Sequence, residues 1–188
     1  MRAGPETSRR GLDVADGLGD IARMIIRPEG PEDVASIRAL TNAAFAGVAH
    51  SSQTEGAIID ALRSAGALAV SLVAERDGSI IGHVGFSPVL INGEDRGWFG
   101  LGPVSVSPSD QRAGVGSALI EAGLKTLSSR GALGCVVLGD PGYYGRFGFT
   151  SGHALCYDGP PPEYFQSLVL GGEPVAGEVA YHAGFEAT

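Results

Sequence analysis

Cysteine is scarce in this sequence, which has two among 188 residues, and tryptophan occurs only once. The two thiols, Cys135 and Cys156, cannot build the disulfide framework of a small secreted domain, and their spacing is not that of a metal site. We therefore expect a cytoplasmic protein without a metal ion. Long apolar runs are also missing, because no stretch approaches the roughly 20 residues that a membrane-spanning helix needs. The sequence predicts no membrane partner.

Positive charge is in short supply as well. Lys and Arg number 13 against 21 Asp and Glu, which gives a formal net charge of −8. Such a surface disfavours polyanions, and we expect neither a nucleic-acid partner nor binding to an anionic membrane. A cationic or neutral substrate suits this charge better.

The apolar residues are numerous enough for one hydrophobic core. They make up 44% of the chain, and 188 residues are too few for two ordinary domains. Residues 1–23 carry mixed charges and several glycines without a sustained hydrophobic period, so they are predicted to be a flexible N-terminal extension. Residues 24–188 are predicted to form a single folded domain.

Hydrophobic periodicity divides this domain into helices and strands. The 3.6-residue period predicts helices over residues 31–46, 54–65 and 114–130, and Asp140-Pro141 opens a shorter helix that ends at Gly148. Apolar and β-branched runs predict strands over residues 24–27, 69–76, 79–86, 96–106, 134–139, 150–155 and 175–181, with a short turn around residues 163–166. Asp77-Gly78 and Asn92-Gly93 are typical of tight hairpins. The pattern indicates an α/β (α+β) fold with a mixed, mostly antiparallel central sheet flanked by helices.

The strand over residues 96–106 contains residues that weaken a regular ladder, namely Gly100, Gly102 and Pro103. Such residues inside a strand usually mark a bulge, which bends the strand away from its neighbour. The alternative is a simple irregularity of an edge strand.

The same strand leads into a glycine-containing turn and then an apolar helix. Backbone N–H groups at the start of that helix should converge on an anion. Because Gly114 and Gly116 lack a Cβ atom, a diphosphate could approach the main chain, and the Arg112 guanidinium could reach it from the side. The alternative is an ordinary strand-to-helix loop that happens to contain two glycines.

The order Gln111-x-x-Gly114-x-Gly116 after a Val-x-Val-x-Pro strand resembles the acetyl-CoA motif of the GNAT superfamily of N-acetyltransferases. The resemblance implies a GNAT fold with splayed strands and acetyl-CoA as cosubstrate, with pantetheine between the strands and pyrophosphate on residues 111–116. The cofactor-binding residues that it implies are Val104, Ser105, Val106, Gln111, Arg112, Ala113, Gly114, Val115, Gly116, Ser117 and Tyr144.

A second resemblance lies in Tyr144-Gly145-Arg146-Phe147-Gly148-Phe149, where an aromatic residue precedes Gly-Phe by four positions. Together with residues 138–141 it is most similar to the YhbS-like branch of the superfamily, although Asp140 stands where many members have Asn. The resemblance implies that Tyr144 contacts the CoA sulfur. A phenol can protonate a departing thiolate near neutral pH, so Tyr144 is the candidate catalytic acid. The alternative is that Tyr143 and Tyr144 are both core aromatics, which is the interpretation we favour for Tyr143.

A general base is harder to assign. An alkyl ammonium must lose a proton before it can attack, and His83, Glu94 and Asp140 are the candidates. Each also has a structural interpretation, as a sheet residue, an exposed turn residue and a helix N-cap, respectively. His50, His153 and His182 lack partner spacing, and no Ser-His-Asp order, Cys-His pair or metal cluster emerges, which argues against a hydrolase or metalloenzyme.

These patterns favour an N-acetyltransferase that transfers the acetyl group directly from acetyl-CoA to a primary amine of a small molecule or peptide. The rival hypothesis is a non-catalytic module that binds acetyl-CoA as a ligand or sensor. The sequence leaves open the identity of the amine acceptor and the choice between a monomer and a homodimer.

The predicted extension can be tested by truncation. If residues 1–23 lie outside the folded domain, a chain that begins at Met24 should keep its melting temperature and its CoA affinity. Calorimetric melting and CoA titration of both chains would measure this. A fall of many degrees would show that the extension stabilises the domain.

Overall fold

The computed structural model describes residues 24–48, 53–152 and 154–188. The predicted extension, His50 and His153 lie outside this described part. The strands are β1 (Ile25–Pro28), β2 (Val70–Arg76), β3 (Ser79–Ile91), β4 (Glu94–Val106), β5 (Gly134–Leu138), β6 (Leu155–Cys156), β7 (Phe165–Val169) and β8 (Gly177–Ala180). The helices are η1 (Pro31–Asp33), α2 (Val34–Phe45), α3 (Glu55–Ser64), α4 (Val115–Ser129), α5 (Pro141–Tyr144), η2 (Gly145–Phe147), η3 (Pro162–Tyr164) and η4 (Ala183–Glu186).

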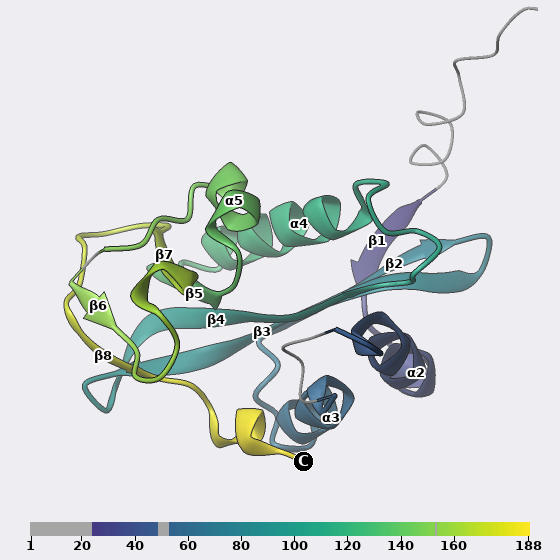
Figure 1. Cartoon of the computed structure of the whole chain (residues 1–188), viewed down its shortest axis with the longest axis horizontal. Helices are drawn as coiled ribbons and strands as arrows, with labels where there is room; N and C mark the ends of the chain where they lie inside the picture. Colours follow the sequence, from purple (N-terminus) through teal and green to yellow (C-terminus); the bar gives the residue numbers. More distant parts are fainter. Residues whose placement is uncertain (1–23, 49–52, 153) are drawn as a thin grey trace, which may run out of the picture.

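The sheet is mixed and mostly antiparallel, as predicted. Its main strand order is β1-β2-β3-β4-β5-β7, and within this order only β4 and β5 run parallel. The β8 strand pairs with the far end of β3 and also with β6. Helix α4 covers one face of the sheet, and α2 and α3 cover the other (Figure 1).

Both predicted hairpins are confirmed. Asp77 and Gly78 have φ values of 51° and 76°, and Asn92 and Gly93 have values of 52° and 79°. Positive φ at two successive residues gives a turn whose twist matches that of the flanking strands. The β3 strand is longer than predicted because it continues to Ile91, directly before the second of these turns.

Residues of β3 alternate between the two faces of the sheet. A Cβ atom at Gly82 would lie 2.8 Å from Leu119 of α4, whereas one at Gly85 would lie 3.1 Å from Ile59 of α3. On the α4 face, Phe86 packs against Gly123, where a Cβ atom would come within 2.2 Å of its ring. Buried apolar side chains on both faces therefore fix the positions of α3 and α4 relative to the sheet.

The predicted bulge occurs in β4. Val84 faces Val104 while Phe86 faces Leu101, so Gly102 and Pro103 of β4 oppose a single residue of β3. Pairing between β4 and β5 ends at Gly100, after three residue pairs. Beyond this point no described strand pairs with β4 on that side, and the two strands diverge.

Two predictions for the C-terminal part are wrong. The strand expected over residues 150–155 is reduced to an isolated bridge from Thr150 to Ser167 and to the two-residue β6. The turn expected near residues 163–166 ends at Tyr164, where strand β7 begins and pairs with β5. Long-range pairing with the buried β5 strand stabilises β7, and the positive φ of 82° at Gly152 interrupts the expected strand.

A group of polar side chains connects the segment after β1 to α3 and the sheet. Arg63 donates hydrogen bonds to Glu29 through Nε (2.8 Å) and Nη2 (2.9 Å), and the Ser71 hydroxyl donates another (2.6 Å). The buried His83 ring lies 2.8 Å from the same hydroxyl oxygen through Nε2. Burial alone would raise the pKa of Glu29, but hydrogen bonds from Arg63, His83 and Ser71 outweigh it and hold the pKa well below its usual range.

This group predicts a pH-dependent loss of stability in a Glu29→Gln variant. Removing the charge should lower the free energy of unfolding by about 1–3 kcal/mol at pH 7, because charge-assisted hydrogen bonds are lost. Since folding lowers the pKa of Glu29, its stabilisation is complete above the ordinary value of 4.5 and is lost as the pH falls further. Thermal melts at pH 7 and pH 3.5 should therefore show a smaller difference from wild type at the lower pH. An equal difference at both pH values would contradict this assignment, and Glu173→Gln, at an exposed carboxylate, is the control.

Candidate functional site

The β4–α4 connection ends in a glycine that begins a helix. Gly114 has φ of +87° and is the N-cap of α4, without a side chain that could cap the helix. Its carbonyl accepts the first helical hydrogen bond, from Ala118, at 3.0 Å. The N–H groups of the first turn have no partners within the helix and carry the positive end of its dipole. This geometry suits an anion at the start of a 15-residue helix.

A cavity of about 400 Å³ opens beside the part of β4 that extends beyond its pairing with β5, and at the start of α4. It is lined by Ala44, Phe45, Val104, Val106, Gln111, Arg112, Gly114, Gly116, Ser117, Tyr143, Tyr144 and Arg146. We call it the β4–α4 cavity. Most of the predicted cofactor residues therefore meet at one cavity, and they come from β4, the following loop, α4 and α5.

Three of the predicted residues do not line this cavity. Ser105 is buried and donates a hydrogen bond to the Thr41 hydroxyl at 3.0 Å, so its side chain faces α2. Val115 is 1% exposed and belongs to the core between α4 and the sheet. Ala113 is exposed in the loop. The side chains of Ser105 and Val115 are thus structural, and only the backbone groups of these two residues remain available to a ligand.

Gly116 lies at a close approach between the helix and its surroundings. A Cβ atom there would be 3.0 Å from the Tyr143 hydroxyl and 3.5 Å from Val106. Tyr143 lines the cavity as well, while its ring packs against the hydrophobic core, as predicted for a core aromatic. Any side chain at position 116 would reduce the space beside the helix N-terminus.

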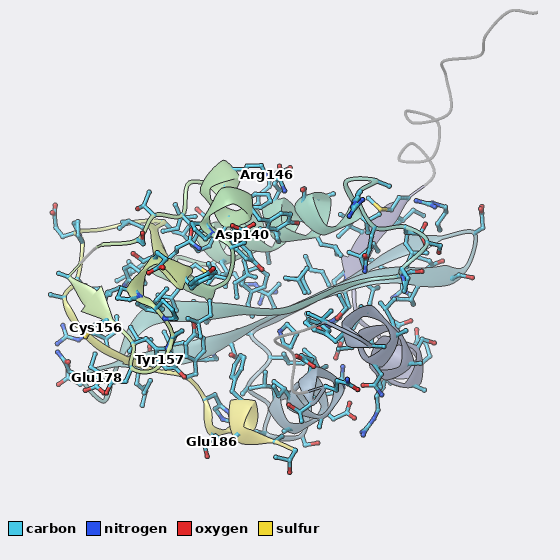
Figure 2. All side chains as sticks on the ribbon, viewed as in Figure 1. Asp140, Arg146, Cys156, Tyr157, Glu178 and Glu186 are labelled. Carbon is cyan, nitrogen blue, oxygen red and sulfur yellow. The ribbon has the colours of Figure 1, made fainter. Side chains whose placement is uncertain are left out.

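Arg146 is a cavity residue that the sequence interpretation missed. Its guanidinium carbon lies 4.4 Å from the centre of the Tyr143 ring, and its Nε donates to the Tyr143 carbonyl at 3.2 Å. Figure 2 shows Arg146 on the same side of the sheet as α4. With Arg112, it gives the cavity two cations that could contact phosphate groups. The sequence feature that could have indicated Arg146 is its position within the second motif, residues 144–149.

Tyr144 is held on α5 by aromatic contacts and by a glycine. Its ring lies against Gly139, where a Cβ atom would be 2.2 Å from Cε2, and its centre is 6.1 Å from that of Phe149. Burial raises the pKa of Tyr144 well above its usual value, with the neighbouring Tyr143 adding to the effect. The phenol therefore holds its proton at neutral pH, while the same burial makes it a weaker acid than an exposed tyrosine.

A second cavity, of about 310 Å³, adjoins the first. Its lining consists of Phe45, Glu55, Ile58, Leu101, Gly102, Pro103, Val104, Leu138, Tyr144, Tyr157, Tyr181 and Phe185. We call it the aromatic cavity. Phe45, Val104 and Tyr144 line both cavities, so they form the junction. Tyr157 lies in the C-terminal part of the chain (Figure 2), which the sequence did not connect with a site.

The three candidate bases lie elsewhere in the described part of the chain. His83 is fully buried beside Ser71 and Glu29, and burial lowers its pKa. Glu94 forms an exposed ion pair with Arg96 at 2.7 Å. Asp140 is the predicted N-cap, because its carboxylate accepts from the Gly142 N–H at 2.9 Å.

Further features of the described residues bear on the hydrolase, metalloenzyme and membrane-protein interpretations. His182 accepts a hydrogen bond from the Gly184 N–H at 3.0 Å and caps η4. Within residues 24–48, 53–152 and 154–188, no group of three or more His, Cys, Asp or Glu side chains could hold a metal ion. In the same part of the chain, no helix has both the length and the apolar character needed to cross a membrane.

Comparison with known proteins gives consistent results across sequence and structure. Residues 25–152 match the family model described as an acetyltransferase (GNAT) domain. The uncharacterized N-acetyltransferase YhbS of Escherichia coli K12 is 38% identical over 169 residues, which cover 86% of this chain and 98% of that protein.

Two solved structures combine substantial identity with the same fold. A GNAT family acetyltransferase from Brucella melitensis, in complex with acetyl-CoA, is 54% identical and superposes with a TM-score of 0.78, over 86% of this chain and 97% of that one. The Escherichia coli YhbS structure, in complex with CoA, is 37% identical with a TM-score of 0.80, over 87% and 92% of the two chains. The matched domain, the extended identity and the shared fold show that this chain belongs to the GNAT family of acetyltransferases, and that it is similar to YhbS.

Proposed function

We propose that this protein transfers the acetyl group of acetyl-CoA to a primary amine by direct attack, without a covalent enzyme intermediate. The observation that carries the proposal is the position of Tyr144, which lines both cavities and stands at their junction. The β4–α4 cavity then holds the thioester, and the aromatic cavity holds the amine. The relatives solved with acetyl-CoA or CoA support the choice of cosubstrate.

The β4–α4 cavity fits acetyl-CoA at both ends. Backbone groups of Val104 and Val106, in the part of β4 that has left β5, are available to pair with the pantetheine arm. The open N–H groups at the start of α4 and the guanidinium of Arg112 suit the pyrophosphate. Gly116 leaves the space that the diphosphate needs.

The reaction requires one new bond and one broken bond. The amine nitrogen bonds to the thioester carbonyl carbon, and the carbon–sulfur bond breaks with its electron pair on sulfur. Tyr144 gives its proton to the thiolate, and its phenolate regains one from the nitrogen, which becomes an amide. The proton that the substrate ammonium loses before attack passes to solvent.

Further assignments follow from the same interpretation. Residues 24–188 form the catalytic domain, and the protein works in the cytoplasm. Support for the location comes from Cys135 and Cys156, which are both free thiols. A non-catalytic acetyl-CoA sensor is the alternative, and the release of CoA when a pooled library of primary amines is added distinguishes an enzyme from a sensor.

The pyrophosphate position can be tested with Gly116→Val. The new side chain would compete with the phosphates for space beside Tyr143, so calorimetric CoA affinity should fall at least tenfold, or about 1.4 kcal/mol. Gly116 is the better position for this test, because a substitution at Gly114, which has a positive φ, would also strain the backbone. Gly145→Val is the control, because a Cβ atom at Gly145 meets nothing within 4 Å. Unchanged affinity in a folded Gly116→Val protein would refute the assignment.

The acid role of Tyr144 can be tested with Tyr144→Phe. The ring remains, so cofactor affinity should stay within a few-fold while the single-turnover rate falls at least tenfold, since a positioned acid contributes about 10²–10⁴-fold. Because burial raises the pKa of Tyr144, its ionisation should not reduce the wild-type rate between pH 6 and 9. Rapid-quench measurements with an amine from the library would show this.

Two further variants complete the test of Tyr144. Tyr164→Phe, at an exposed tyrosine that lines neither cavity, is the control and should keep the wild-type rate. A full single-turnover rate in Tyr144→Phe would contradict the acid role. A large loss in Tyr143→Phe instead would transfer that role to its neighbour.

A further inference from the structure

The aromatic cavity has a wall of aromatic rings that contact one another and come from the C-terminal part of the chain. Tyr157 and Tyr181 meet edge to face with their centres 5.1 Å apart, and Tyr181 meets Phe185 at the same distance. The Tyr181 ring also lies over Gly100 of β4, where a Cβ atom would be 2.6 Å from it. These contacts fix the wall against the sheet, so the cavity is a preformed apolar surface that suits a flat or bulky hydrocarbon group.

Glu55 is the only charged residue among the described residues that line this cavity. It lies in the first turn of α3, where the helix dipole favours a negative charge. Gly56 holds this turn close to α2, because a Cβ atom there would be 2.3 Å from the Asn42 side-chain oxygen. The backbone that carries the carboxylate is therefore held in place beside Phe45 at the end of α2, which lines the same cavity.

Tyr181 carries a hydroxyl group on a ring of the apolar wall. Its hydroxyl oxygen is buried and has no hydrogen-bond partner among the residues that the structure describes. Burial raises the pKa of Tyr181 well above its usual value, so the group remains a neutral hydroxyl. Because this oxygen is not exposed to the cavity, the wall remains apolar where Tyr181 lines it, and Glu55 provides the charge of the described lining.

From these observations we infer that the acceptor is a small primary ammonium compound with an aromatic or other bulky apolar body, and that Glu55 binds its ammonium group. This inference rests on the proposed function, because it assigns the aromatic cavity to the acceptor. The volume of about 310 Å³ suits a small molecule. A single carboxylate among aromatic rings attracts a cation through charge and through the faces of the rings.

The same arrangement disfavours other amines. An amino acid brings a carboxylate next to its ammonium group, and no described lining residue of the cavity offers a cation to compensate it. A short polar amine leaves the aromatic wall uncovered and gains little from apolar burial. Glu55 is thus a specificity-determining residue. Tyr144 lies at the junction, where the amine in the aromatic cavity would attack the thioester in the β4–α4 cavity.

The experiment is a calorimetric titration of the CoA-saturated protein with 2-phenylethylamine, ethylamine and phenylalanine in turn. The dead-end complex with CoA reports acceptor binding without turnover. We expect 2-phenylethylamine to bind at least tenfold more tightly than ethylamine, which lacks the ring, and than phenylalanine, which adds a carboxylate. In Glu55→Gln its affinity should fall at least tenfold while CoA affinity stays unchanged. Glu173→Gln is the matched control, because this exposed carboxylate lines neither cavity.

Equal affinity for the three compounds, or an unchanged affinity in Glu55→Gln, would overturn the inference. The comparison of ligands uses only wild-type protein, so it decides the matter even if Glu55→Gln does not fold. Tighter binding of a peptide amino terminus than of 2-phenylethylamine would also overturn it. Steady CoA release from acetyl-CoA tests the proposed function separately. Selective binding without any release would refute catalysis alone, and release without selectivity would refute the assignment of Glu55 alone.

Discussion

The divergence of β4 from β5 is the constraint on which the rest of the site depends. The two strands pair only as far as Gly100, and one extra residue at Gly102-Pro103 then changes the register of β4 against β3. Backbone groups in a sheet interior normally satisfy one another. Here the remainder of β4 is left open towards a cavity, at the point where α4 also exposes its first N–H groups. The open part of β4 and the start of α4 thus border one cavity, where we propose that acetyl-CoA binds.

Much of the fold and half of the site could be predicted because their signals are local. Asp77-Gly78 specifies a turn by its own conformation, and Gly114 begins a helix by adopting a positive φ. The β4–α4 residues are also close in sequence, so a short motif contains most of one cavity. Their resemblance to the acetyl-CoA motif indicates the ligand class before any tertiary structure is known.

The aromatic cavity could not be predicted in this way because its lining comes from distant segments. Glu55 begins α3, Leu101 lies in β4, and Tyr157 and Tyr181 follow more than fifty residues later. No periodicity brings such residues together, since tertiary packing alone does so. The β7 strand was missed for a related reason, because its conformation depends on pairing with β5 and not on its own turn residues.

The open stretch of β4 has a consequence for association between chains. Unpaired strand edges attract the strands of other proteins and lead to aggregation. In this protein the open part of β4 borders a cavity of about 400 Å³ that Phe45, Tyr143 and Tyr144 also line. An added strand of five or six residues needs a length of about 17–20 Å and room for its side chains. The narrow thioester arm that we propose for this cavity needs less room than such a strand, so the side chains that line the cavity restrict the access of another chain to the open backbone.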